Sequence, residues 1–169
     1  FQAEDGIRDI SVWLEFRRVL FRSSWYHNWG TIPKKDGTPY STVKGAFRNH
    51  PCTQWAAESY ENLAWLIRHG YALCNEYRHR YGKIHSCLDS LYVAEDIFTT
   101  KTCDTIYIHK NVKSFTRAMP DEWKNNTTID TFEAYKKYIA SKPWVADNYL
   151  RIPTRKPEWI WLWVKTFCG

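Results

Sequence analysis

No pair of cysteines in this sequence has the spacing of a zinc ribbon or a redox motif. An odd number of dispersed cysteines argues against a disulfide scaffold and against a structural zinc site. It favours reduced thiols in a cytoplasmic protein. The five cysteines are Cys52, Cys74, Cys87, Cys103 and Cys168.

Long hydrophobic runs are also missing. Crossing a bilayer takes about 20 apolar residues in succession, and no run in this sequence approaches that length. A secretory segment is not recognisable either. We therefore expect neither a transmembrane helix nor a membrane partner.

The histidines show no metal-binding pattern, because the six of them are dispersed along the chain. His79 and His85, or His50 and His85 if folding brings them together, could share a metal ion. Histidines at helix ends are more often solvated. We therefore expect no metal site and no cofactor.

Aromatic and basic residues, by contrast, are abundant. The 169 residues include 10 Trp, 11 Tyr and 8 Phe, and the formal net charge is +6, with an isoelectric point near 9.0. So much ring surface either fills a core or lines a pocket that stacks planar ligands, and the charge favours anionic partners. We expect DNA or a small anionic nucleotide, because basic and aromatic residues alternate along the same segments.

The segment 50–85 is the longest stretch that can be interpreted as one continuous helical unit. Asn49 and His50 precede Pro51, which suits a first helical position because it lacks an N–H group. An interior glycine costs about 1 kcal/mol relative to alanine, so at Gly70 we expect a kink or two helices in series. One largely apolar stripe recurs at steps of three or four: Trp55, Ser59, Asn62, Leu66, His69, Leu73 and Tyr77.

The end of this segment has two interpretations. Gly82 is placed as a helix C-cap and the cations before it suit the negative end of the helix dipole, which describes a well-capped surface helix. The alternative is an anion-binding corner, in which aromatic faces take a base and cations take a phosphate. That corner would consist of Tyr77, Arg80, Tyr81, Lys83 and His85.

The rest of the chain combines loops with shorter helical patterns. Glycines and prolines predict a long loop over residues 24–49, and residues 88–93 predict a short helical turn. Residues 105–109 are either a brief strand or an ordered loop. A helix should begin at Asp121, after Pro120. A clear amphipathic helix spans 131–140, with Phe132, Tyr135, Tyr138 and Ile139 facing inward.

The first 23 residues, FQAEDGIRDISVWLEFRRVLFRS, are similar to translated sequencing-adapter read-through, which recurs at the ends of proteins predicted from environmental DNA. We therefore expect residues 1–23 to be a non-native segment that replaces the native N-terminus. Residues 24–169 should form one domain, with a mainly α fold that is compact and has long loops. The apolar tail 160–167 either packs in that domain or mediates self-association, which leaves a homo-oligomer open.

Several blocks of the sequence resemble one protein family. The blocks are HPCTQWAAES (50–59), ENLAWL (61–66), ALCNEYRHRYGKIH (72–85), RAMPDEW (117–123), EAYKKY (133–138) and KPEW (156–159). They are similar to a bacteriophage family related to pyrimidine-dimer DNA glycosylases of the endonuclease V type. The resemblance covers about residues 48–159 and implies the cytoplasm of an infected bacterial host as the location.

The resemblance implies a compact all-α fold with a basic cleft. Such glycosylases attack the sugar C1′ with an amine to form a Schiff base, while a glutamate assists and a base is flipped out of the DNA. Their nucleophile is the amine of the mature N-terminus, and an Asp-Lys-His segment also precedes the loop in the phage family. This chain has neither, so an internal amine such as that of Lys83 would have to substitute.

The resemblance also implies roles for individual residues. Glu58 or Glu76 would orient or assist, and either could instead be a surface carboxylate or an arginine partner. Arg80, Lys83 and Arg117 would clamp phosphates, and Trp55 or Tyr81 would stack on a displaced base. The complete set of predicted ligand-binding residues is His50, Trp55, Asn62, Tyr77, Arg80, Tyr81, Lys83, His85 and Arg117.

Two other functions remain open at this point. The same corner could belong to a non-catalytic phage protein, a sponge that sequesters a nucleotide immune signal of host defence, because stacking rings plus Arg and Lys suffice for binding. Alternatively, the protein is structural and its aromatic residues form the core.

Overall fold

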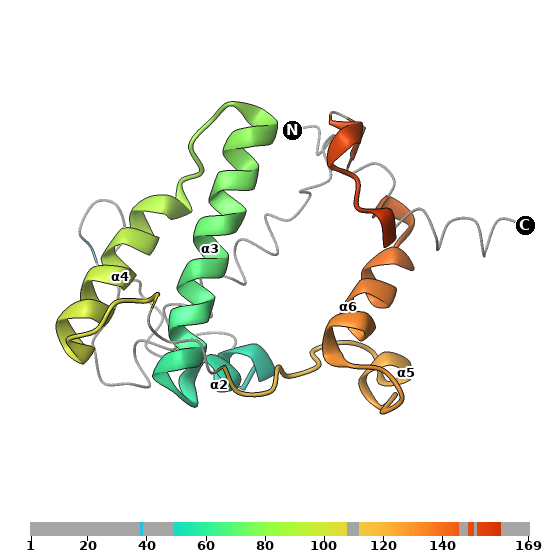
Figure 1. Ribbon diagram of the computed structural model, residues 1–169, viewed down its shortest axis with the longest axis horizontal. Helices are drawn as coiled ribbons and strands as arrows, with labels where there is room; N and C mark the ends of the chain where they lie inside the picture. The colour runs from blue at the N-terminus through green and yellow to red at the C-terminus, as the bar shows by residue number, and fades with distance from the viewer. Residues whose placement is uncertain (1–37, 39–48, 108–111, 146–148, 151, 160–169) are drawn as a thin grey trace, which may run out of the picture. The chain divides into compact units, whose positions relative to one another are not determined.

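A computed structural model describes residues 38, 49–107, 112–145, 149–150 and 152–159. Within these ranges every regular element is a helix, which confirms the predicted mainly α fold. The elements are α2 (Pro51–Ala57), α3 (Tyr60–Tyr81), α4 (Cys87–Thr102), α5 (Asp121–Lys124), α6 (Thr131–Ala140), and the 3-10 helices η1 (Pro143–Val145) and η3 (Pro153–Arg155) (Figure 1).

The chain divides into two compact units, one formed by Ser11–Phe115 and the other by Phe1–Ile10 with Thr116–Gly169. Each unit is described by itself, and the single domain predicted for 24–169 stays a prediction. The segment 1–23 and the tail 160–167 lie outside the described residues, as does the loop 24–49 apart from residues 38 and 49.

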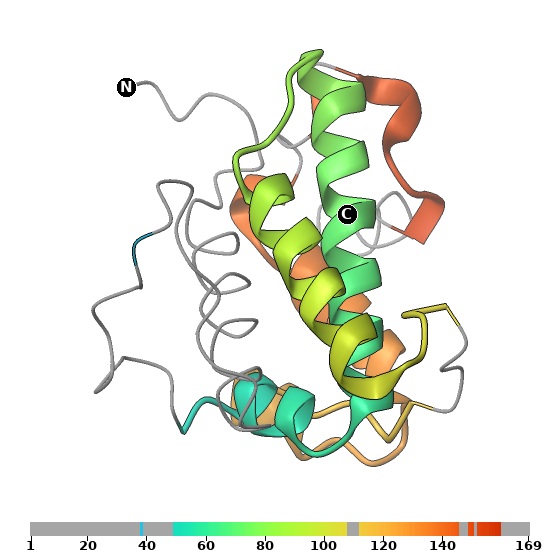
Figure 2. The same ribbon diagram turned by 90° about the vertical axis from the view of Figure 1, so that its left-hand side faces the viewer.

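The first unit is built on the pairing of α3 with α4. The two helices lie side by side and run in opposite directions, and α2 packs beside the first turns of α3 (Figures 1 and 2). Their shared core consists of large apolar side chains with at most 1% of their surface exposed: Leu63, Ile67, Leu91 and Phe98. Hydrophobic burial between these two helices, each several turns long, therefore holds the unit together.

The prediction of one continuous helix over 50–85 is wrong at Ser59. This residue has an extended backbone (φ −158°, ψ 159°), and its hydroxyl accepts a hydrogen bond from the Asn62 N–H at 3.2 Å. A serine that caps a following helix competes with continuation of the preceding one. The apolar stripe continues across the break, which is why periodicity alone did not reveal it.

Two glycines, one inside α3 and one just after its end, behave differently. At Gly70 we expected a kink or two helices in series; the helix continues through this buried residue, so the second alternative is wrong. Gly82 ends the helix as predicted: it adopts a left-handed conformation (φ 63°, ψ 17°), and its N–H donates to the Arg78 carbonyl at 2.8 Å. This conformation carries no Cβ penalty for glycine.

The segment after α3 is more helical than its sequence pattern indicated. The short turn predicted at 88–93 is part of α4, which has 16 residues. Its early positions lack strong apolar periodicity because the helix buries small residues such as Ser90 and Ala94 against α3. Residues 105–107 form a turn rather than a strand, and Ile106 in this turn is fully buried.

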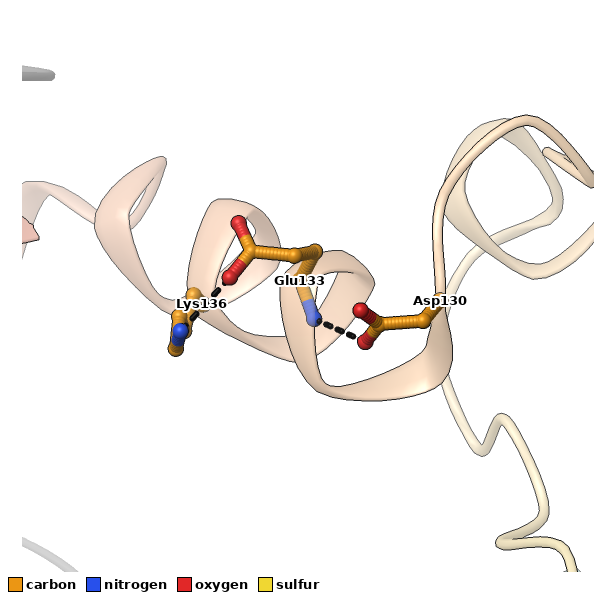
Figure 3. A network of polar contacts seen from close by, with 3 residues as sticks. All are labelled: Asp130, Glu133 and Lys136. Atoms are coloured by element: carbon orange, nitrogen blue, oxygen red, sulfur yellow. Dashed lines mark hydrogen bonds and ion pairs between the residues drawn. The ribbon is translucent and has the colours of Figure 1, made fainter.

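The second unit contains α5 and α6, and both begin where the sequence predicted. α5 starts at Asp121, after Pro120. At the start of α6 the Asp130 carboxylate accepts a hydrogen bond from the Glu133 N–H at 2.9 Å, and Lys136 pairs with the Glu133 carboxylate at 2.5 Å (Figure 3). This arrangement places a negative charge at the positive end of the helix dipole.

The predicted inward face of α6 is partly wrong. Phe132 is 56% exposed and Ile139 is 36% exposed, whereas Ala134 is the fully buried side chain of this helix. Tyr135 does face the unit: its hydroxyl donates to the Thr116 carbonyl and accepts from the Ala118 N–H, both at 3.0 Å. A ten-residue helix can bury only a narrow strip of its surface against the rest of its unit.

None of the helices in the described part of the chain is both long enough and apolar enough to cross a membrane.

Candidate functional site

The predicted site residues of the first unit fall into two groups at opposite ends of α3. The first group lies on α2 and the first turn of α3, and the second lies at the end of α3 and in the loop 82–86 (Figures 1 and 2). A 22-residue helix is about 33 Å long. The two groups therefore cannot contact the same small ligand.

In the first group, Asn62 acts as a buried connector. Its side chain is fully buried, its Nδ2 donates to the Trp55 carbonyl at 2.7 Å, and its Oδ1 accepts from the Lys113 N–H at 3.0 Å. Two of the polar atoms that a ligand would need are thus bonded to the protein's own backbone. Asn62 ties α2 and the segment 112–115 to α3.

Trp55 belongs to the same connection. Its indole Nε1 donates to the Lys113 carbonyl at 3.4 Å, and its ring stacks on Phe115 at 4.8 Å between centroids. Trp65 meets both rings edge-on, at 5.6 Å from Trp55 and 4.7 Å from Phe115. With 5% of its surface exposed, Trp55 packs as core and offers little area to a displaced base.

His50 and Glu58 lie at the two ends of α2. The Nδ1 of His50 accepts a hydrogen bond from the Cys52 N–H at 3.2 Å, so this histidine caps the helix. Glu58 is the C-cap residue and is exposed, and its backbone carbonyl accepts from the Lys113 Nζ at 3.4 Å. Both residues are exposed enough to reach solvent, and both also define the bounds of α2.

The second group forms a compact aromatic corner at the end of α3. The Tyr77 ring lies 4.7 Å from the Tyr81 ring and 4.8 Å from the His85 ring, which it meets edge-on at 78°. Tyr77 and Tyr81 are neighbours because they are four residues apart on one helix. His85 returns to them because the chain reverses at Gly82. We call these residues, with Lys83, the 77–85 corner.

The hydrogen bond of His85 fixes the orientation of its ring. Its Nδ1 accepts from the Cys87 N–H at 3.2 Å, immediately before α4 begins. In the neutral imidazole the proton then resides on Nε2, which makes this atom a donor.

The charged residues of the corner differ in their surroundings. Arg80 Nε donates to Glu76 Oε1 at 2.7 Å, and the two side chains are only 13% and 22% exposed. Arg78, His79 and Lys83, by contrast, are exposed in or just after the last turn of α3. Sequence reasoning favoured Arg80 and omitted Arg78, although both cations lie in the same turn.

Arg117, which was predicted to clamp a phosphate, lies in the second unit and binds backbone there. Its guanidinium donates to the Thr131 hydroxyl and the Trp123 carbonyl, both at 3.3 Å, and also to the Asn126 and Ile129 carbonyls. These bonds use four of the five N–H donors of the group. Arg117 therefore fixes the connection between α5 and α6.

Two further features complete the description of the site. In the described part of the chain, no three His, Cys, Asp or Glu side chains are grouped so that they could hold a metal ion.

His69 stacks flat on Trp65, with 4.8 Å between centroids and 10° between planes. The residue keeps an exposed side, but the packing of its ring against Trp65 lowers the pKa of His69 through desolvation.

Comparison with known proteins links part of the chain to a protein family. The profile of a family described as pyrimidine dimer DNA glycosylase matches residues 10–89. No curated protein and no solved structure matches the chain. The matched part contains α2, α3 and the whole 77–85 corner, and it does not reach Arg117.

The match also begins inside the segment 1–23, whose proposed non-native origin stays a prediction. Over residues 10–89 the chain is therefore similar to the family described as pyrimidine dimer DNA glycosylase.

Proposed function

We propose that this protein binds DNA as a pyrimidine dimer DNA glycosylase-like protein, and that the 77–85 corner contacts the DNA. The observation that carries the proposal is the arrangement of aromatic rings at the end of α3, where the Tyr77 ring centroid lies within 4.8 Å of those of Tyr81 and His85. Exposed cations lie next to these rings, inside the part of the chain that matches the family. Rings stack on unpaired bases and cations neutralise phosphates.

The position of the corner at a helix C-terminus makes its cations necessary. The last carbonyl groups of a helix carry partial negative charge, which repels phosphate. Arg78 and Lys83 lie at this end of α3 and oppose that charge, while Arg80 is compensated by Glu76. The net charge of +6 adds a long-range attraction for DNA.

The salt dependence of DNA affinity tests this proposal. If Lys83 neutralises one phosphate, Lys83→Ala should reduce the slope of log K against log[salt] by about 0.9 on duplex DNA. Lys101→Ala is the matched control, because Lys101 is also exposed and lies in the last turn of α4. Equal slopes for the two variants would remove the corner from the DNA interface.

The glycosylase chemistry requires an amine and a carboxylate in one place. We propose Lys83 as the amine and Glu76 as the carboxylate, since both belong to the second group. Glu58 precedes α3, and the rise of the helix from its start to Glu76 is about 24 Å, so Glu58 cannot assist at the corner. The ion pair with Arg80 keeps the Glu76 carboxylate in place.

Borohydride trapping tests the chemistry separately from binding. An amine that attacks the sugar C1′ of an abasic site forms an imine, and borohydride reduces this imine to a stable covalent adduct. The adduct should form with the wild-type chain and with Lys101→Ala, and it should be lost with Lys83→Ala. If the wild-type chain binds abasic DNA without forming an adduct, the proposed function reduces to binding.

A nucleotide sponge of phage origin is the second candidate function. The observation that favours it is the same corner, because stacking rings and cations hold a nucleotide without any nucleophile. Calorimetry with cyclic dinucleotides and ADP-ribose-like molecules distinguishes the two functions. Tight binding that Tyr81→Ala abolishes, together with weak and salt-insensitive affinity for duplex DNA, would favour the sponge.

A further inference from the structure

A second aromatic cluster, separate from the 77–85 corner, lies where α3, α4 and the turn after α4 meet. The Tyr71 hydroxyl donates to Glu95 Oε2 at 2.6 Å, and the Tyr71 and Tyr92 rings lie 5.8 Å apart at 50°. Tyr92 and Glu95 are three residues apart on α4 and therefore share a face. The bond between Tyr71 and Glu95 joins the two helices beside that face.

Tyr107 is held next to this cluster by the turn that follows α4. Arg68, one turn before Tyr71 on α3, donates from Nη1 to the Ile106 carbonyl, and Ile106 is fully buried. Tyr107 lies in this anchored turn and is near enough to Tyr71 to raise the pKa of Tyr71 electrostatically. Two of the three rings remain open to solvent, since Tyr92 is 56% exposed and Tyr107 is 65% exposed.

Acidic side chains predominate on the α4 side of the cluster. Burial, followed by the hydrogen bond and charge of Glu95 and then by Tyr92 and Tyr107, raises the pKa of Tyr71 far above its ordinary value. Tyr71 therefore stays a protonated donor. Asp89 and Asp96 add exposed carboxylates along α4, whose one basic residue in the last turn is Lys101. This side of α4 is thus acidic within a chain that carries a net charge of +6, and Arg68 of α3 is a cation at the adjacent turn.

We propose that Tyr71, Tyr92, Tyr107 and Glu95 form a binding site for the ammonium groups of an aliphatic polyamine. Tyrosine faces attract organic cations through their quadrupole, and Glu95 has a second carboxylate oxygen beyond the one bonded to Tyr71. Asp89 and Asp96 are separated by about 10 Å along the helix axis, a spacing that suits a flexible ligand with several positive charges.

Calorimetric titration of the full chain with spermidine tests this site. Glu95→Gln should weaken binding about tenfold, because a charge-assisted hydrogen bond is lost. Tyr92→Ala and Tyr107→Leu should each weaken it about threefold, as expected for an exposed cation–π contact. Tyr107→Leu breaks no hydrogen bond of the cluster, so it serves as the second variant if Glu95→Gln perturbs the packing of α3 on α4.

Two controls separate the site from general charge attraction. Glu122→Gln removes an exposed carboxylate from the second unit, and Tyr60→Ala removes an exposed ring from the start of α3. Neither should change spermidine affinity by more than about twofold. Absence of spermidine binding at millimolar concentration would overturn the proposal, as would equal losses with Glu95→Gln and Glu122→Gln.

A lysine-rich peptide provides the remaining arm of the experiment. It carries the same ammonium chemistry on a protein chain. If the peptide binds with the same dependence on Glu95 and Tyr92 while spermidine does not bind, the polyamine assignment is overturned in favour of a protein partner. The outcome does not depend on the DNA experiments, because Lys83 and the 77–85 corner take no part in the cluster.

Discussion

Replacing Asn62 tests whether this residue holds the first unit together or serves a ligand. In Asn62→Ala the Lys113 N–H loses its acceptor, while the Trp55 carbonyl keeps a hydrogen bond from the Glu58 N–H at 3.2 Å. Two lost hydrogen bonds of about 0.5–1.5 kcal/mol each, with a further desolvation cost for the Lys113 N–H, give a destabilisation of about 2–4 kcal/mol.

Urea unfolding followed by tryptophan fluorescence measures this loss, with the m-value compared to confirm that the transition is unchanged. Asn75→Ala is the matched control, since Asn75 is exposed on the same helix and should alter stability by less than about 0.5 kcal/mol. At urea concentrations below those that unfold the variant, the DNA affinity of Asn62→Ala should equal that of the wild-type chain. A loss of DNA affinity with unchanged stability would refute the structural role of Asn62.

Three further predictions concern other parts of the chain. Arg117→Met should destabilise the second unit by about 2–4 kcal/mol, because several backbone carbonyls lose a charged donor; chemical unfolding measures this, and an unchanged DNA salt slope should accompany it. The pKa of His69 is lower in the folded chain than its ordinary value of 6.5, so below pH 6.5 the unfolded chain binds more protons than the folded chain. The free energy of unfolding should therefore fall as the pH decreases below 6.5. His69→Gln should remove this part of the pH dependence in unfolding titrations. Gly82→Ala should cost about 1 kcal/mol in thermal unfolding through backbone strain alone, because an added Cβ meets nothing within 4 Å; a much larger cost would contradict that account.

Local signals in the sequence were sufficient to place several helix ends. Pro51 and Gly82 act through their own backbone chemistry and Asp121 through its charge at a helix start, and the structure confirms all three positions. The break at Ser59 escaped because the amphipathic stripe continues across it. Phe132 was assigned to the core from periodicity, yet a short helix buries only part of that face.

The site was harder to predict than the fold, because its decisive contacts are not local. Asn62 was recognised as a polar residue on an apolar stripe, but its partner Lys113 lies 51 residues away and offers only backbone atoms. Arg117 likewise binds carbonyl groups, which have no signature in a sequence. Residues of the 77–85 corner were predicted together because they are close in sequence, and for the same reason they are close in space.

Photocross-linking to DNA tests the central claim most directly. The chain is irradiated with DNA that contains 5-iodouracil at single positions, and the cross-linked residues are identified by mass spectrometry of the peptides. We expect adducts on Tyr77, Tyr81 or His85, because their rings form the proposed stacking surface. Efficient cross-linking confined to other residues, with none at the 77–85 corner, would contradict the assignment of this corner to DNA.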